Sequence, residues 1–198
     1  MALWDTGGMS LPPLPLGAVV LAGGTAARMG GADKASIELD GRTLLAWALD
    51  AVIDAGEVVV LGDWVRTDRP VTFTREDPAQ GGPAAGLLAG LDAFARRPAR
   101  LVVLAVDMPR VSMDTVARLR AAAEGHDGAV LCGPDGRRQL AMVLDAERLH
   151  AVRPPYAEEH GLPLHRLLAP LDLAEVPARG DEARDVDGWA DLRDLRRT

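Results

Sequence analysis

The sequence predicts a single α/β domain built on a mostly parallel sheet, with some antiparallel pairing in its later part. First, short apolar runs alternate with helical patterns from Gly17 onward, as in chains that wind strands and helices in turn. Second, these runs are too short and too evenly apolar for exposed helices, which is typical of strands buried on both faces. Third, 198 residues are enough for one sizeable core, so one domain is expected.

Four apolar runs are predicted to be buried strands, and they lie at residues 18–22, 58–61, 71–74 and 101–106. Between the first two, residues 43–55 place their leucines on one stripe and their aspartates on the other side. That spacing predicts an amphipathic helix.

Three further helices and a hairpin complete the expected domain. Pro83 suits the first position of a helix, Ser112 is a plausible N-cap, and residues 188–196 carry an apolar face at helical spacing. Residues 129–132 and 139–144 flank a turn sequence rich in Gly, Pro and Asp. They predict a β-hairpin, which makes the sheet mixed.

Composition disfavours several classes of partner. The chain has 22 basic and 29 acidic residues, a net charge of −7 and only 4% aromatic residues. A general binder of nucleic acid or of an anionic membrane is therefore not expected. No run approaches the roughly 18 to 20 apolar residues of a membrane span.

One cysteine and four scattered histidines fit a reducing cytoplasm and show no metal-ligand spacing. Residues 1–15 lack the basic start of a secretory signal. We expect residues 1–15 to be a disordered lead-in and residues 16–198 to form the domain.

The distribution of basic residues draws attention to one position. Of the 22 basic residues, 21 are arginines and one is a lysine, Lys34. Coding bias explains an excess of arginine, yet the remaining lysine follows the first predicted strand in a glycine-rich loop. Lysine and arginine differ in this setting, because lysine is a compact mobile charge and arginine a planar fork.

The loop at residues 21–34 has the parts of a polyphosphate cradle. Gly23 and Gly24 allow a ligand close to the backbone and expose amide donors, while Arg28 and Lys34 supply positive charge. The loop is neither a P-loop nor a GxGxxG dinucleotide motif. The alternative is a glycine-rich connection with both charges solvated, and the two glycines alone would favour it.

With the loop in view, the chain resembles the molybdenum cofactor guanylyltransferases and their relatives among the nucleotidyltransferases. Residues 21–34 are similar to the LAGGxSxRMGxDK signature of that family. The likeness continues at residues 40–45 (DGRTLL), 82–87 (GPAAGL) and 107–109 (DMP). It is close over residues 17–110 and weaker afterwards.

The resemblance implies a three-layer, Rossmann-like nucleotidyltransferase fold and a Mg²⁺-dependent transfer of GMP. GTP would donate the nucleotide, the terminal phosphate of the molybdopterin cofactor would accept it, and pyrophosphate would leave. It implies catalytic roles for Lys34, Arg28 and Asp107. The nucleotide-binding residues would be Leu21, Ala22, Gly23, Gly24, Lys34, Asp77 and Asp107.

Other functions remain open. Within the same chemistry, the alternative is transfer of CMP, or transfer to a different phosphorylated acceptor. A different class is a non-catalytic module that binds a nucleotide without turnover. Proteins of cofactor biosynthesis, or oxidoreductases that receive the cofactor, are possible partners.

Two aspartates have competing local interpretations. Asp107 follows the fourth predicted strand, where a carboxylate together with substrate phosphates suits Mg²⁺. It is also placed like a turn or capping aspartate before Pro109. Asp77 matches an aspartate that contacts the nucleotide in the family, and it is also a plausible Asp-Pro loop initiator.

The end of the chain resembles the family less closely. Residues 184–192 are similar to a closing (D/N)V(D/N)TPEDL motif, but Thr-Pro-Glu is replaced by residues 188–190, Gly-Trp-Ala. By analogy, Asp187 would complete the metal site or touch the acceptor, and Asp185 would support it and is a candidate acceptor-binding residue. The alternative is that Asp187 caps the last helix. Further acceptor-binding candidates are Arg137, Gln139 and His165, which are also explained as solvated surface residues.

Overall fold

The computed structural model describes residues 14–23 and 33–196. Their central sheet has seven strands in the order β5-β4-β1-β6-β8-β7-β9. β8 pairs antiparallel with both neighbours and every other pairing is parallel, so the predicted mixed sheet is confirmed. The strands are β1 (Leu14–Leu21), β4 (Glu57–Leu61), β5 (Thr72–Thr74), β6 (Pro98–Ala105), β7 (Gly128–Cys132), β8 (Arg138–Asp145) and β9 (Leu173–Pro177).

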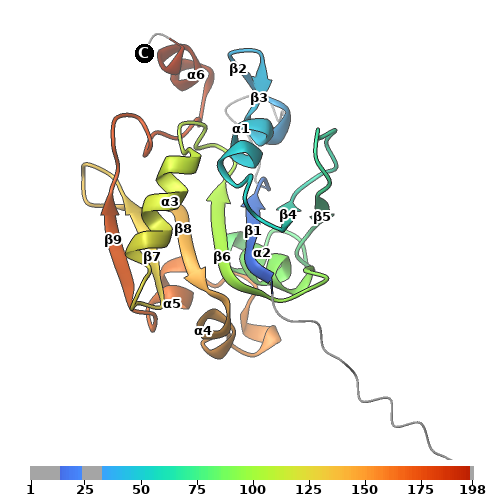
Figure 1. Ribbon diagram of the computed structural model, residues 1–198. Helices are drawn as coiled ribbons and strands as arrows, with labels where there is room; N and C mark the ends of the chain where they lie inside the picture. The colour runs from blue at the N-terminus through green and yellow to red at the C-terminus, as the bar shows by residue number, and fades with distance from the viewer. Residues whose placement is uncertain (1–13, 24–32, 197–198) are drawn as a thin grey trace, which may run out of the picture.

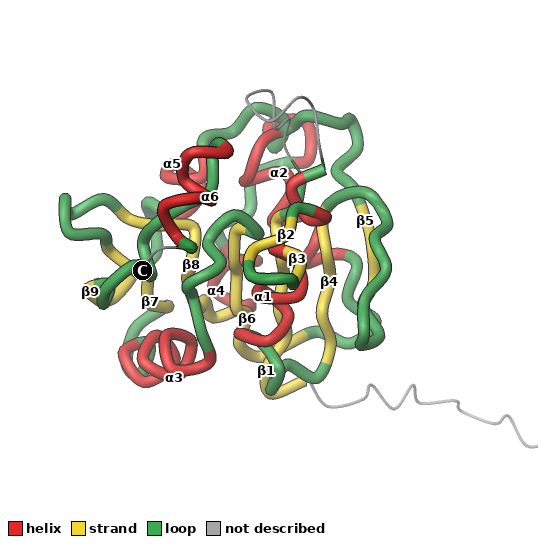
Figure 2. The backbone as a smooth tube through the Cα atoms, turned by 90° about the horizontal axis from the view of Figure 1, so that it is seen from above, coloured by secondary structure: helices red, strands yellow, loops and turns green. Residues whose placement is uncertain are grey.

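Helices cover both faces of this sheet, which confirms the three-layer α/β fold. In Figure 2 the main helices α1 and α3 lie on one side of the row of strands and α2 and α5 on the other. A small hairpin, β2 (Glu38–Leu39) and β3 (Arg42–Thr43), precedes α1. The helices are α1 (Leu44–Ala51), α2 (Gly82–Asp92), α3 (Met113–Ala122), α4 (Ala146–Ala151), α5 (Leu164–Leu168) and α6 (Trp189–Leu195), with 3₁₀ turns η2 (Lys34–Ser36) and η3 (Tyr156–Glu158).

The predicted helix starts are confirmed by local contacts. The Ser112 side chain accepts a hydrogen bond from the backbone N–H of Thr115 at 3.4 Å and caps α3. Pro83 lies in the first turn of α2, where its missing N–H costs no hydrogen bond. Helix α1 is shorter than predicted because the chain turns after Ala51, where Val52 forms its C-cap.

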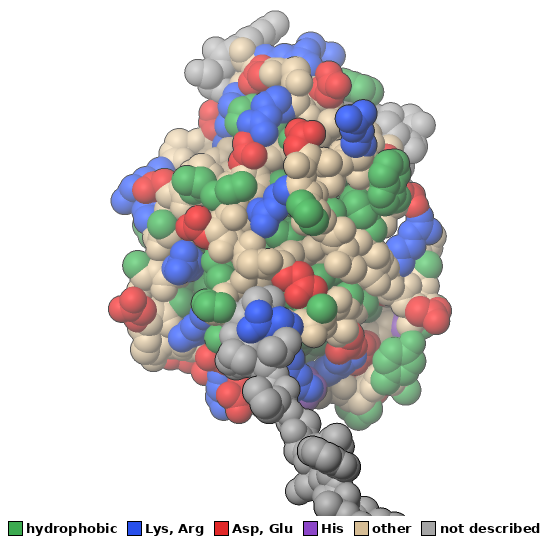
Figure 3. Space-filling model, turned by 45° about the vertical axis from the view of Figure 1, so that its right-hand side comes forward, with side chains coloured by type: hydrophobic (Ala, Val, Ile, Leu, Met, Phe, Trp, Pro, Cys, Tyr) green, Lys and Arg blue, Asp and Glu red, His purple; other side chains and the backbone are tan. Residues whose placement is uncertain are grey.

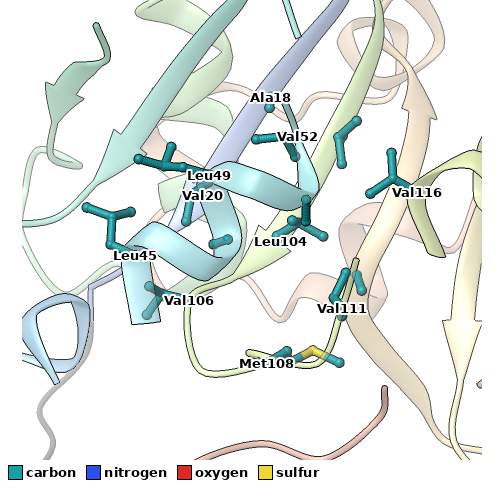
Figure 4. Close-up of a cluster of buried hydrophobic side chains, with 14 of the residues drawn as sticks. Ala18, Val20, Leu45, Leu49, Val52, Leu104, Val106, Met108, Val111 and Val116 are labelled. Carbon is teal, nitrogen blue, oxygen red and sulfur yellow. The ribbon is translucent and has the colours of Figure 1, made fainter. Parts of the chain in front are cut away.

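Two apolar clusters fill the space between the layers. One lies under α1, α3 and α6, and the other lies under α2, α4 and α5. Because successive residues of a strand face opposite sides, β1 contributes Val20 to the first cluster and Val19 to the second. Figure 4 shows Ala18 and Val20 of β1 beneath Leu45 and Leu49 of α1.

Three features of the fold differ from the prediction. β1 begins at Leu14, so Leu14 and Pro15 belong to a strand rather than to the expected lead-in; residues 1–13 lie outside the described part. The edge strand β9 was missed because exposed positions such as Glu175 interrupt its apolar pattern. The six-residue helix α4 was missed because it is too short to show helical periodicity.

The strand order creates a topological switch point at β1. The chain leaves β1 through α1 to β4 on one side, while β6 lies on the other side. Loops that follow such strands border a crevice in which open α/β sheets bind ligands. In Figure 1 the arrow of β6 points toward the end of the molecule that carries α6 and the β2–β3 hairpin.

The surface carries charges of both signs. On the face seen in Figure 3, basic and acidic side chains are interspersed among apolar ones. In the described ranges, no helix has the length and apolar character needed to cross a membrane.

Candidate active site

The loop after β1 starts at the switch point. The backbone N–H of Ala22 donates to the carbonyl of Leu61 on β4 at 2.8 Å, and that of Val106 donates to the carbonyl of Leu21 at 3.0 Å. Leu21 and Ala22 are buried, and Gly23 is exposed. The strand end is therefore held from both sides and delivers Gly23 to the surface. Gly24 and Arg28, two further predicted residues, lie outside the described residues.

Lys34 emerges from a short, well-anchored turn. Asp33 caps the 3₁₀ turn η2, because its carboxylate accepts hydrogen bonds from the N–H of Ala35 at 3.1 Å and from the hydroxyl of Ser36 at 2.8 Å. The buried Ala35 fixes the turn to the core. The Lys34 side chain is only 13% exposed, and its position is set by this turn.

The ammonium group of Lys34 lies between two carboxylates. Its Nζ is 2.8 Å from Oδ2 of Asp107 and 3.1 Å from Oδ1 of Asp187. Lys34 follows β1, Asp107 follows β6 and Asp187 precedes α6. Three segments far apart in the sequence therefore meet at one point, which we call the Lys34 cluster.

The structure excludes one local interpretation of Asp107, that of a helix cap. Its neighbours Val106 and Met108 are buried and belong to the core cluster under α1 (Figure 4). The cap of α3 is Ser112, not Asp107. The Asp107 carboxylate accordingly accepts from Lys34 and is available to a ligand on its exposed side.

The helix-cap interpretation of Asp187 is wrong. The cap position of α6 is Gly188, and the Asp191 carboxylate accepts from the N–H groups of Asp187 at 3.1 Å and Gly188 at 2.8 Å. Because Asp191 satisfies these backbone donors, the Asp187 carboxylate is left to face Lys34. Val186, which is fully buried, donates its N–H to the carbonyl of Asp107 at 2.8 Å and joins the two acidic segments.

The electrostatics of the cluster are unbalanced toward negative charge. Partial burial lowers the pKa of Lys34, but the hydrogen bonds and charges of Asp107 and Asp187 raise it more, so it lies above its ordinary value. Asp185 has a raised pKa, because its surroundings partly exclude water and because Asp187, Asp107 and Asp191 repel its charge. One ammonium thus faces several carboxylates.

This donor set fits a divalent cation. Asp107 and Asp187 already converge on one cationic group, and their oxygens are the hard ligands that Mg²⁺ and Mn²⁺ take in proteins. No group of three or more His, Cys, Asp or Glu side chains with metal-binding geometry occurs in the described part of the chain. A cation here would have two protein carboxylates, and phosphate oxygens and water would supply the remaining ligands.

Comparison with known proteins assigns the chain to a family. A family model described as a MobA-like NTP transferase domain matches residues 18–176. The chain belongs to this family. The match spans the sheet from β1 nearly to the end of β9, and it includes Lys34 and Asp107 but ends before Asp187.

Curated relatives of this NTP transferase share one name. The molybdenum cofactor guanylyltransferase of Rhodopseudomonas palustris (strain HaA2) is 37% identical over 179 residues, covering 85% of this chain and 77% of that protein. The protein of the same name from Burkholderia orbicola (strain MC0-3) is 33% identical over 192 residues, covering 91% and 84%.

Solved structures share the fold at lower identity. The 2-C-methyl-D-erythritol 4-phosphate cytidylyltransferase of Thermus thermophilus is 22% identical, with a TM-score of 0.69 over 90% of this chain and 96% of that one. A manganese complex of Rv0371C from Mycobacterium tuberculosis H37Rv is 20% identical, with a TM-score of 0.68 over 94% and 100%. The fold by itself therefore does not identify the nucleotide or the acceptor.

Asp77 has a different set of neighbours from the Lys34 cluster in this NTP transferase. It borders a cavity of about 310 Å³ beside α2, whose described lining does not include Lys34 or Asp107. The hydroxyl of Tyr156 donates to the carbonyl of Asp77, and the Asp77 residue is exposed. Tyr156, which the sequence analysis did not single out, therefore holds the loop in place.

The residues predicted to bind the acceptor substrate do not lie together in the structure. Arg137 and Gln139 lie at the β7–β8 hairpin, where Arg137 pairs with Asp135 at 3.3 Å and Gln139 donates to the carbonyl of Arg137 at 3.2 Å. His165 is exposed on α5, which belongs to the opposite helix layer from α1 and α3. Of these residues, Asp185 is the one whose pKa is raised by the carboxylates of the Lys34 cluster, Asp187 and Asp107.

Proposed function

We propose that this protein transfers GMP from GTP to the terminal phosphate of the molybdopterin cofactor and releases pyrophosphate. The family match and the shared name of the relatives support this activity. The structural observation that carries it is the meeting of Lys34, Asp107 and Asp187 beside the switch point of the sheet.

In this reaction an oxygen of the acceptor phosphate attacks the α-phosphorus of GTP. The bond from the α-phosphorus to the oxygen bridging to the β-phosphate breaks, and pyrophosphate leaves with the electron pair. No covalent intermediate with the protein is required, so the protein contributes positioning and charge stabilisation. Gly23 lies where the backbone can approach the nucleotide closely.

Asp107 and Asp187 would hold a divalent cation, for which we infer Mg²⁺. Bound there, Mg²⁺ would neutralise charge on the phosphates. Lys34 stays protonated, because its pKa lies above the ordinary value. Its flexible stem lets the ammonium move from the carboxylates to a phosphate oxygen and follow the charge as the bonds change. Arg28 would supply a second positive charge.

Guanine is proposed over cytosine because the relatives named as guanylyltransferases are more similar in sequence than the cytidylyltransferase is. We propose that the loop from Leu21 to Gly24 and Asp77 contact the nucleotide. Asp185 in the closing segment and Gln139 at the β7–β8 hairpin are proposed to face the acceptor.

We place the reaction in the cytoplasm, where the single free and buried Cys132 stays reduced. The product would then pass to other proteins of cofactor biosynthesis or to the oxidoreductases that use it.

A pyrophosphate-release assay tests the proposal. The purified chain is incubated with Mg²⁺ and each of the four nucleoside triphosphates, with and without molybdopterin. Release is expected only with GTP and acceptor together, and it should stop when the metal is chelated. Release with CTP and acceptor would instead indicate a cytidylyltransferase. GTP binding without release, with acceptor present, would indicate a non-catalytic module.

A further inference from the structure

A buried glutamate anchors the segment that carries Asp187. The chain from residue 178 to residue 187 joins β9 to α6, and Glu182 lies in its middle. Only 8% of Glu182 is exposed. We call Glu182, Thr115 and Arg118 the Glu182 latch, because the last two residues belong to α3 and hold the segment against it.

Both carboxylate oxygens of Glu182 are satisfied. Oε1 accepts from the hydroxyl of Thr115 at 2.7 Å and from the guanidinium of Arg118 at 2.5 Å. Oε2 accepts from the same guanidinium at 2.5 Å and from the backbone N–H of Arg179 at 2.7 Å. A buried charge with such charge-assisted contacts is held in one geometry, since losing the Arg118 guanidinium would leave it without a counter-charge.

The partners on α3 are themselves fixed. Thr115 is fully buried, and its hydroxyl oxygen accepts from the N–H of Ser112 at 3.1 Å while it donates to Glu182. Arg118 also donates to the carbonyl of Pro177 at 3.2 Å, at the end of β9. The latch therefore holds the beginning of the segment as well as its middle.

A second anchor lies next to Asp187. Val186 is fully buried, and its N–H donates to the carbonyl of Asp107. Between the two anchors, the N–H of Arg184 donates to the carbonyl of Asp181 at 2.9 Å and closes a turn. Only three residues separate Glu182 from Val186, so the free length of chain that leads to Asp187 is short.

We infer that Glu182 is a positioning residue for the transfer site: through the latch it keeps the Asp187 carboxylate opposite Asp107. This inference rests on the proposed role of Asp187 as a cation ligand. Without the latch, the segment would gain conformational freedom, and ordering it again would cost free energy each time a cation binds. Partners that hydrogen-bond directly to a metal ligand commonly change metal affinity about 10- to 100-fold, and Glu182, which acts through five residues of chain, is expected at the lower end of that range.

Glu182→Gln is the first test. Glutamine keeps the shape but loses the charge, and its NH₂ group would face a donor, either Arg118 or the Arg179 N–H. Mn²⁺ binding is measured by electron paramagnetic resonance in the presence of a non-hydrolysable GTP analogue. We expect binding to weaken about 10-fold, with a smaller change in the KM for GTP. Unchanged Mn²⁺ affinity would overturn the inference.

Asp114→Asn is the matched control, because Asp114 is the other carboxylate that accepts from Arg118, at 3.3 Å, and its side chain is 70% exposed. It should leave Mn²⁺ affinity unchanged. If Glu182→Gln fails to fold, as judged by circular dichroism, Thr115→Val removes one latch contact, together with the acceptor of the Ser112 N–H, at nearly constant volume. It should weaken Mn²⁺ binding in the same direction by a smaller factor, and unchanged binding would again overturn the inference.

A double-mutant cycle separates positioning from general loosening. If Glu182 acts through Asp187, Glu182→Gln should cause no further loss of Mn²⁺ affinity in an Asp187→Asn background. If the fold-losses of Mn²⁺ affinity from the two substitutions multiply in the double mutant, Glu182 does not act through Asp187 and the positioning role is overturned. A silent Asp187→Asn would overturn both the cation role of Asp187 and this inference, whereas GTP-dependent transfer could still be measured and would stand.

Discussion

The Lys34 cluster and the Glu182 latch are two ionic groups that share one segment of chain, which supplies Asp187 to the first and Glu182 to the second, and they are built in opposite ways. In the Lys34 cluster one ammonium serves two carboxylates, whose side chains are 22% and 51% exposed. In the latch one carboxylate receives donors from three residues, and its side chain is 11% exposed. The first has surplus negative charge that is accessible to solvent, and the second has none.

This contrast distinguishes a group that can bind a ligand from a group that supports the fold. A partly exposed group with too few counter-charges can exchange its partner for a ligand at little cost. A buried, fully hydrogen-bonded group cannot exchange a partner in this way, because the remaining charge would be left unpaired in the low-dielectric interior of the protein. Substitutions in the Lys34 cluster are expected to have larger effects than substitutions in the Glu182 latch.

The largest effect is expected from Asp107→Asn. It removes the negative charge of one proposed cation ligand, while Val106 and Met108 still hold the loop in the core. Metal-dependent pyrophosphate release should fall about 10³-fold, with thermal unfolding nearly unchanged. An Asp107→Asn protein that keeps normal metal dependence would remove Asp107 from the cation site.

Lys34→Ala should lower turnover about 10²-fold, as the loss of one preorganised charge contact does. The same substitution should raise the affinity for Mn²⁺ measured without nucleotide, because Lys34 no longer competes for Asp107 and Asp187. Pyrophosphate release and Mn²⁺ titration measure the two effects. Lys34→Arg keeps the charge as a control, and if it were kinetically silent, a mobile ammonium would not be needed.

Glu182→Gln should lower the free energy of unfolding near neutral pH by about 2 kcal/mol, typical of hydrogen bonds to a charged group. Burial raises the pKa of Glu182, but its hydrogen bonds with Arg118, Arg179 and Thr115 lower it more, so it lies below the ordinary value. The stabilisation is therefore complete above the unfolded pKa of about 4.3. It is lost as the pH falls through the lower pKa of the folded protein.

Urea unfolding of the wild type and of Glu182→Gln at a series of pH values checks this. The difference between the two proteins should be constant above about pH 5.5, more than one unit over the unfolded pKa, and should shrink in acid. A difference that does not depend on pH would show that the charge of Glu182 contributes nothing to stability.

The smallest effect is expected from Asp114→Asn. Its carboxylate lies on the exposed side of Arg118, where an ion pair contributes little because water screens it. The free energy of unfolding should change by no more than about 0.5 kcal/mol, and turnover should not change. A larger loss in either measurement would extend the latch to Asp114.

Local patterns predicted much of the fold. The strands around residues 18–22, 58–61 and 101–106 and the helices that begin near Pro83 and Ser112 are all present. These elements are long or evenly apolar, so periodicity and capping residues define them. Strand β9 and helix α4 were not predicted, because short elements with polar positions carry too few residues to show a period.

The family resemblance and the candidate loop follow from the sequence alone, which also marks Lys34 as the one lysine of the chain. The three-dimensional fold was needed to show which carboxylates Lys34 meets, at separations of 73 residues for Asp107 and 153 for Asp187. It also decided that Asp187 is not a helix cap and that Glu182 binds α3 from 64 residues away. Local propensities follow from neighbouring residues, whereas these pairings depend on strand order and on how the closing segment packs, which no local pattern encodes.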